Sequence, residues 1–305
     1  MSGGDRRTLT SATLAGVSEP LVFAEDLRID VDGVPACDGL TFQTGGDHEL
    51  VLGAPRALFE ATAGRRRVVR GTLRVRGSAA DAAVREGIVA GAPLDPPLPP
   101  KWTALDYVTW SSRLAGHTAS DARTLAKEAI ALVQLGALAT SAIDRLLPHA
   151  KRGVVLASAL ATGAAVIALE DPLATLPEEI ARSWARILVS ALADRSWIVF
   201  AARISLTSPV AMNADEALMV SSSRLDAQGP PAEIAAADHR YVARIHGPLE
   251  ALGARLSERG AKMDVQGAQV LIDLGSTVTT ADLLGICMEL DATVVELAPV
   301  ARALT

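Results

Sequence analysis

A charge-free segment that ends in two adjacent carboxylates constrains the fold of this chain more than any other feature. Residues 154–169 contain no charged side chain, and Glu170, Asp171 and Pro172 follow them directly. The run is shorter than the span of about 20 residues that a membrane helix needs, and Gly163 interrupts it. We therefore expect a buried helix end, a turn and a buried strand, which delivers its acids to the carboxyl edge of a parallel sheet.

Strands and helices alternate over most of the chain, which predicts an α/β fold with a mixed, mostly parallel sheet and helices on its faces. The proline-rich stretch 94–102 predicts an extended loop, because proline is excluded from helix interiors and central strands. The expected strands are 21–31, 39–43, 49–52, 70–76 (an edge strand), 87–90, 166–169 and 197–201, and the expected helices are 57–63, 103–116, 120–135 and 177–193.

Three segments of different composition predict the domain organisation. Residues 1–20 are rich in Ser, Thr, Gly and Ala and lack the apolar core of a signal peptide, so we expect a flexible tail. Residues 21–237 carry the α/β pattern. In residues 238–305 the expected order is strand, helix, strand, strand, helix, strand, which is typical of a small ferredoxin-like α+β domain.

Composition excludes several classes of function. The 305 residues carry a net charge of −6 at pH 7, and an acidic chain of this kind is not built to coat nucleic acid. Cys37 and Cys287 form no paired motif, which indicates a reduced compartment with neither a disulfide framework nor a zinc site. The five histidines show no ligand spacing. The sequence therefore predicts no metal site and no nucleic-acid partner.

With these elements in place, residues 21–234 resemble the ATP-binding subunit of ABC transporters. The segment from residue 238 onwards resembles the small C-terminal domain on ATPases of the drug and polysaccharide exporter branch. The resemblance implies a P-loop NTPase-like fold with a helical subdomain, and it implies dimers that work with a membrane subunit. Four segments carry it by their order and spacing: VFAEDLRIDVDGVPACDGLTF at 22–42, WTALDYVTWSSRLAG at 102–116, VIALEDP at 166–172 and SSSRLDAQGPPAEI at 221–234.

The phosphate loop of that family is degenerate in this chain. Its motif spans about eight residues, in which backbone N–H groups and a Lys surround the phosphates and a hydroxyl holds Mg²⁺. Only Gly53 of this motif remains, and the loop is roughly four residues shorter than the motif requires. Arg56 offers a cation nearby, but Pro55 beside it lacks an N–H. The plainer interpretation is an ordinary strand-to-helix turn.

The other nucleotide positions implied by the resemblance are also substituted. Val31 stands where the family stacks an aromatic ring on adenine, and Gly91 stands where a glutamine senses Mg²⁺ and the γ-phosphate. Arg203 replaces the switch histidine, and Pro177 replaces an aspartate after the catalytic strand. The signature Leu-Ser-Gly-Gly-Gln, which caps the ATP of a partner, falls on Leu-Leu-Pro-His-Ala at 146–150. These changes predict that no nucleotide cofactor binds.

Glu170 and Asp171 stand in the reverse of the family's order, in which a Mg²⁺-associated Asp precedes a water-polarising Glu. The exchange lengthens one side chain by a methylene and shortens the other, which matters where a misplacement of about 1 Å costs about a hundredfold in rate. The alternative is that the pair is a turn feature before Pro172. Because the metal and phosphate supports are missing as well, we expect no ATP hydrolysis.

Two further features point to partners. Trp102, Tyr107 and Trp110 lie where the family's ATPases grip the coupling helix of a membrane subunit, and Trp and Tyr are enriched at interfaces. The alternative is that they pack in the core along a helix face. A basic cluster after the first expected helix predicts a solvated edge strand, or else contact with anionic lipid or an acidic partner. It consists of Arg65, Arg66, Arg67, Arg70, Arg74 and Arg76.

The sequence thus predicts a catalytically inactive ABC-type ATPase, a pseudo-ATPase, that acts as a structural or regulatory subunit of an export-type transporter or related membrane complex. We expect it in the cytoplasm, peripheral on the inner face of the cell membrane. Its expected partners are a polytopic membrane subunit and a second ABC ATPase, identical or different. Two alternatives stay open: an active, atypical ATP-binding subunit that uses Arg56 and Arg203 for phosphate charge, and a soluble interaction module.

Overall fold

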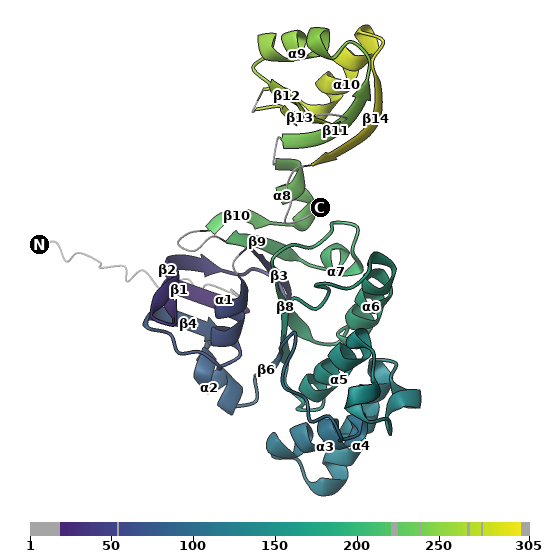
Figure 1. Ribbon diagram of the computed structural model, residues 1–305. Coiled ribbons are helices and arrows are strands. Elements are labelled where there is room, and N and C mark those ends of the chain that lie inside the picture. The colour runs from purple at the N-terminus through teal and green to yellow at the C-terminus, as the bar shows by residue number, and fades with distance from the viewer. Residues whose placement is uncertain are drawn as a thin grey trace, which may run out of the picture.

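A six-stranded mixed sheet forms the centre of the fold (Figure 1). The structure, a computed structural model, describes residues 19–53, 55–220, 225–237, 240–266, 269–275 and 277–299. The sheet order is β10-β9-β3-β8-β7-β6, in which β10 is antiparallel to β9 and the other pairs are parallel. The predicted α/β fold with a mixed sheet is therefore confirmed. The strands are β3 (His48–Leu52), β6 (Val89–Ala92), β7 (Val166–Glu170), β8 (Ser196–Ala201), β9 (Glu216–Val220) and β10 (Leu225–Gly229).

Both faces of this sheet are buried, because alternate residues of each strand point to opposite sides. In β8, Ile198 and Phe200 belong to one hydrophobic cluster, whereas Trp197 and Val199 belong to the other. Strands buried on both faces need the continuous apolar runs that the sequence carries at β7 and β8. The predicted helix end, turn and strand over residues 154–169 are confirmed. Within the described residues, no helix is long and apolar enough to cross a membrane.

The first face is covered by α1 and by an antiparallel sheet of order β2-β1-β4-β5. Asp32 and Gly33, with φ of 51° and 80°, form the two-residue turn from β1 to β2 that an Asp-Gly pair favours. The prediction that β4 is the edge strand is wrong in part, because β5 pairs with its last residues. The elements are β1 (Val22–Val31), β2 (Val34–Gln43), α1 (Pro55–Thr62), β4 (Arg70–Val75), β5 (Ser78–Ala79) and α2 (Ala80–Arg85).

Helices α3 to α6 cover the second face and supply most of its hydrophobic cluster (Figure 1). The predicted cap at Thr103 is confirmed, because its hydroxyl accepts the N–H of Asp106. The proline-rich stretch that precedes this helix contains no helix or strand, as expected. The helices are α3 (Ala104–Leu114), α4 (Ala119–Leu132), α5 (Pro148–Leu160), α6 (Glu178–Ala191) and α7 (Pro209–Met212), with short 3-10 turns at Gly136–Leu138 and Ile143–Arg145.

The last part of the chain forms a four-stranded antiparallel sheet of order β12-β13-β11-β14, which follows α8 (Figure 1). Its elements follow the predicted β-α-β-β-α-β order, and the buried members of its hydrophobic cluster run from Ala243 to Ala292. Thr279 and Asp282 form a capping box at the start of α10. The predicted boundary at residue 238 and the first 18 residues of the predicted tail, which is expected over residues 1–20, lie outside the described residues. The elements are α8 (Pro231–Ala237), β11 (Arg240–His246), α9 (Leu249–Glu258), β12 (Lys262–Gln266), β13 (Gln269–Asp273), α10 (Thr280–Glu289) and β14 (Thr293–Pro299).

Candidate functional site

The connection between β3 and α1 stands where a phosphate loop would lie, and it consists of two residues, Gly53 and Ala54. The N–H of Gly53 donates to the carbonyl of Ala201 at the end of β8 over 3.2 Å. Gly53 has φ of 111°, and a Cβ on it would lie 2.2 Å from the carbonyl oxygen of Val220. Gly53 is therefore packed against the ends of β8 and β9, and its N–H is already used within the chain.

Arg56, on the first turn of α1, faces two carboxylates of the chain itself. Its Nε lies 3.3 Å from Oε1 of Glu60, one turn along the helix, and 3.6 Å from Oε1 of Glu170. The Arg56 side chain is 79% exposed, so water screens both ion pairs strongly. Arg56 therefore has acidic neighbours within the chain, one of them at the end of β7.

Glu170 ends β7 and is buried, with 9% of its surface exposed. Its Oε2 accepts the backbone N–H of Leu94 over 3.1 Å, which ties the loop after β6 to the end of β7. Its Oε1 is the atom that Arg56 approaches. Both carboxylate oxygens therefore have partners within the protein.

Asp171 bonds to the opposite neighbour. Its N–H donates to the carbonyl of Phe200 over 2.7 Å, and its Oδ2 accepts the N–H of Ala202 over 3.4 Å, so it ties the end of β7 to the end of β8. Its φ of 37° is uncommon for a residue that carries a Cβ. Burial raises the pKa of this carboxyl, whereas the N–H of Ala202 and the charge of Arg152 lower it. The two acids are adjacent in the sequence, but they bind different neighbours in the structure. Glu170 contacts the loop after β6, and Asp171 contacts the end of β8.

Packing explains two of the other substituted positions. Gly91 lies within β6 opposite Ala168 of β7, and a Cβ on it would lie 2.8 Å from the Cβ of Ala63. This close approach leaves little space for any larger side chain, glutamine included. Val31 ends β1, is half-buried and packs against the cluster on the first face of the sheet. It has no aromatic surface to offer to a base.

Residues 146–150, on which the resemblance places the family's signature, overlap the start of α5. Leu147 is the N-cap and makes no side-chain cap bond, and Pro148 is the first residue of the helix. A helix start that holds a phosphate does so through free N–H groups, and proline has none. Pro177 is likewise an N-cap without a side-chain bond, at the start of α6.

The structure adds a buried cation, Arg152, that the sequence interpretation passes over. It lies on α5 and is 8% exposed. It donates to the carbonyl of Pro172 over 3.2 Å and to Oγ1 of Thr175 over 3.3 Å, so it holds the loop that follows the two acids. Burial lowers the pKa of its guanidinium, and the charges of Asp95 and Asp171 raise it. An arginine at the head of a long apolar helix was the available signal.

A cavity of about 610 Å³ opens at the carboxyl ends of β7 and β8. Acids, arginines and hydroxyls line it, and Arg203, which is exposed, is one of them. Within the described residues, no group of three or more acidic, His or Cys side chains could hold a metal ion. Asp171 lines this cavity, whereas Arg56 does not. Its polar lining includes Asp171, Thr175, Glu178, Arg182, Arg203 and Ser205.

Trp102, Tyr107 and Trp110 form an aromatic patch at the start of α3. The rings of Trp102 and Trp110 meet edge to face at 5.9 Å, and the ring of Tyr107 lies 6.1 Å from that of Trp110. Trp102 is 40% exposed and Trp110 is 45% exposed, whereas Tyr107 is half-buried against the core. Burial raises the pKa of the Tyr107 hydroxyl, and the charge of Arg65 lowers it. The two tryptophans therefore lie on the surface, and Tyr107 packs behind them.

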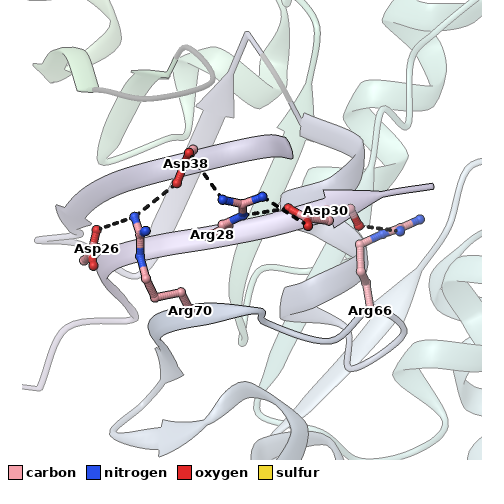
Figure 2. A network of polar contacts seen from close by, with 6 residues as sticks. All are labelled: Asp26, Arg28, Asp30, Asp38, Arg66 and Arg70. Carbon is pink, nitrogen blue, oxygen red and sulfur yellow. Dashed lines mark hydrogen bonds and ion pairs between the residues drawn. The ribbon is translucent and has the colours of Figure 1, made fainter. Parts of the chain in front are cut away.

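Three of the six arginines of the basic cluster, Arg66, Arg70 and Arg76, form ion pairs. Figure 2 shows the two ion pairs that Arg70 makes across the sheet formed by β2, β1 and β4. Arg28 of β1 joins the same network through Asp30 and Asp38. These arginines stabilise the sheet and its neighbours rather than forming one free patch. The partners are Asp26 and Asp38 for Arg70, Glu60 and the carbonyl of Asp30 for Arg66, and Asp47 for Arg76.

Comparison with known proteins identifies the fold. No family model matches the sequence, and no curated protein is similar to it. CbiO1 of Clostridium perfringens, part of the ABC transporter complex CbiONQ, matches with a TM-score of 0.60 at 17% identity over 71% of this chain and 90% of its own. MJ1267 in its ADP conformation, an ATP-binding cassette of an ABC transporter, matches with a TM-score of 0.58 at 14% identity, over 69% of this chain and 91% of its own. Similarity at this level of identity shows a shared fold.

Proposed function

We propose that this chain, whose fold is that of the ATP-binding subunits of ABC transporters, neither binds nor hydrolyses ATP. Its role is that of a structural or regulatory subunit in an export-type transporter or a related membrane complex. The observation that carries this proposal is the two-residue connection between β3 and α1, in which the N–H of Gly53 bonds to Ala201.

A connection this short cannot surround a triphosphate. A phosphate loop uses about eight residues to aim several N–H groups and a lysine at the phosphates. Here α1 begins directly with Pro55, which has no N–H to give. Each charge-assisted hydrogen bond contributes about 1.5–3 kcal/mol, so losing four weakens binding by about 6 kcal/mol, or more than four decades. A dissociation constant of about 1 μM would then rise above 1 mM, so ATP at about millimolar concentration would leave most of the protein unbound.

The contacts of the two acids support the absence of hydrolysis. Glu170 accepts the N–H of Leu94, and Asp171 accepts the N–H of Ala202. Phosphoryl transfer needs carboxylates that are free to hold Mg²⁺ and to orient the attacking water. Carboxylates that hold strand ends together serve the fold instead.

The family's dimer geometry favours a scaffold over a half-active pair. Dimers of the family place each ATP between the phosphate loop of one subunit and the signature of the other. A homodimer of this chain would have no working site. A heterodimer with an active homologue would have one empty site and one site without its signature cap. The second ABC ATPase that we propose as a partner would therefore not gain a normal ATP site from this chain.

The aromatic patch supports a membrane subunit as the other partner. Two tryptophans exposed side by side are typical of contact surfaces rather than of surfaces that face only water. Their position at the start of α3, after the proline-rich loop, is where the resemblance places the grip on a coupling helix. The proposed location on the inner face of the cell membrane follows from such a partner.

Calorimetry of the full chain with Mg-ATP tests the proposal. We expect no saturable heat and no rise of the melting temperature with ATP, while a hydrolysing ABC subunit measured in parallel shows both. A dissociation constant below about 100 μM, or roughly −5.5 kcal/mol, would contradict the proposal and favour the active alternative. In that case Arg203→Ala would weaken the binding. Failure to co-purify with a polytopic membrane protein would instead favour the soluble interaction module.

A further inference from the structure

A hollow of about 650 Å³, here termed the basic hollow, lies between the end of α1, strand β4 and the start of α2. Its size falls in the range of about 300–1,000 Å³ that small-ligand sites occupy. Four arginines and one acid line it: Arg65, Arg66, Arg67, Arg74 and Asp81. It lies apart from the cavity at β7 and β8 and shares no lining residue with it.

Three of these arginines are exposed and lack an acidic partner. Within the described residues, Arg65, Arg67 and Arg74 take part in no ion pair. Arg66 differs, because Glu60 pairs with its guanidinium. The same guanidinium also donates to the carbonyl of Asp30 (Figure 2). Three of the four arginines that line the hollow therefore have no ion-pair partner among the described residues.

Backbone donors add to these charges. The N–H groups of Arg65 and Arg66 both donate to the carbonyl of Glu60, and the N–H of Val69 donates to Arg28. Between them, the N–H groups of Arg67 and Val68 donate to no group among the described residues. Free N–H groups in succession favour anions, since they direct partial positive charge to one place.

The single acid in the lining does not cancel this charge. Asp81 pairs with Arg85 one turn along α2, at 2.9 Å, and this pair lowers the pKa of its carboxyl. The chain as a whole carries a net charge of −6. The basic hollow is therefore a positively charged region on a protein whose net charge is negative. Any attraction of an anion must come from these arginines, because the net charge of the chain repels anions.

We infer that the basic hollow binds a phosphate-bearing anion. A phosphate group offers several acceptor oxygens and up to two negative charges in a compact space, which suits a hollow lined by several guanidinium groups. A single carboxylate offers two oxygens and one charge, so it would satisfy fewer of them. The phosphate belongs either to an anionic lipid headgroup or to a soluble compound. This inference does not rest on the proposed function.

Binding of two reagents to the full chain tests the inference. Inorganic pyrophosphate, measured by calorimetry, represents the soluble source, and phosphatidylglycerol vesicles, measured by flotation against phosphatidylcholine vesicles, represent the lipid source. The test variant is Arg67→Gln with Arg74→Gln. The matched control is Arg123→Gln with Arg186→Gln, which removes the same charge from two exposed arginines on α4 and α6. Because all four side chains are exposed, unchanged melting temperatures are expected.

We expect binding of at least one reagent, weakened about tenfold or more in the test variant, as for the loss of a charge-assisted hydrogen bond. The control variant should bind as the unaltered chain does. Binding of pyrophosphate identifies the soluble source, and binding of phosphatidylglycerol vesicles alone identifies the headgroup. Failure of the unaltered chain to bind either reagent would overturn the inference, as would equal losses in the two variants.

Discussion

The guanidinium of Arg56 lies 3.6 Å from the carboxylate of Glu170, so the first turn of α1 and the end of β7 are joined by opposite charges at the edge of the sheet. The same carboxylate accepts the N–H of Leu94. One carboxylate therefore contacts both the start of α1 and the loop after β6.

Removal of Glu170 should destabilise the protein more than removal of Arg56. Glu170→Ala leaves the partly buried N–H of Leu94 without its acceptor, and an unpaired buried donor costs about 1–3 kcal/mol. Arg56→Ala removes a cation that is largely exposed, and exposed pairs contribute about 0–1 kcal/mol. Chemical denaturation of both variants measures the difference. Equal effects of the two substitutions would show that Glu170 does not hold the loop after β6.

A buried acid outside the candidate site should make stability depend on pH. Glu49 in β3 is fully buried; its Oε1 accepts the N–H of Gly46 over 2.8 Å, and its Oε2 has no partner in the described part of the chain. Burial, with smaller contributions from Glu216, Asp215 and Asp47, raises its pKa from 4.5 to about 8.

The raised pKa of Glu49 determines whether the free energy of unfolding rises or falls with pH. Between pH 4.5 and about 8, the folded protein keeps the proton of Glu49, whereas the unfolded chain loses it. The free energy of unfolding should therefore fall as the pH rises through this window, by on the order of a few kcal/mol. Glu49→Gln should remove this slope and make the protein more stable than the unaltered chain at pH 8. Parallel pH profiles of the two proteins would contradict this prediction.

Loss of the exposed tryptophans should remove the proposed membrane partner without unfolding the chain. Trp102→Ala with Trp110→Ala breaks their edge-to-face contact, which is worth about 0.5–1.5 kcal/mol, so the protein should stay folded. Co-purification with a polytopic membrane subunit should be abolished. Met288→Ala, which removes an exposed apolar side chain from α10, is the control and should leave co-purification intact. Unchanged association of the double variant would refute the interface, and its unfolding would favour the core role.

Residues 238–305 should behave as an independent domain. Their sheet has its own hydrophobic cluster, separate from the two that flank the central sheet. Limited proteolysis of the full chain should cut between residues 235 and 239 and leave two compact fragments, identified by mass spectrometry. Rapid degradation of the C-terminal fragment after the cut would show that it depends on the rest of the chain.

Much of the fold could be predicted because its signals are local. The apolar runs at β7 and β8, the caps at Thr103 and Thr279 and the turn at Asp32 each depend on residues close in sequence. The ends of strands were predicted less accurately. The strand expected at residues 87–90 is β6, which spans Val89–Ala92. The short connection between β3 and α1 could also be predicted, since it follows from the residues between a strand and a helix.

The sequence by itself determined the order of the elements, the buried strand that ends at two acids and the short connection between β3 and α1. Only the tertiary structure decided what the remaining residues contact. The approach of Gly53 to Val220, the packing of Gly91 against Ala63 and the position of Arg152 under the loop after β7 all join segments far apart in the chain. No local pattern encodes such neighbours, because they depend on the register and packing of strands and helices that meet only in the folded protein.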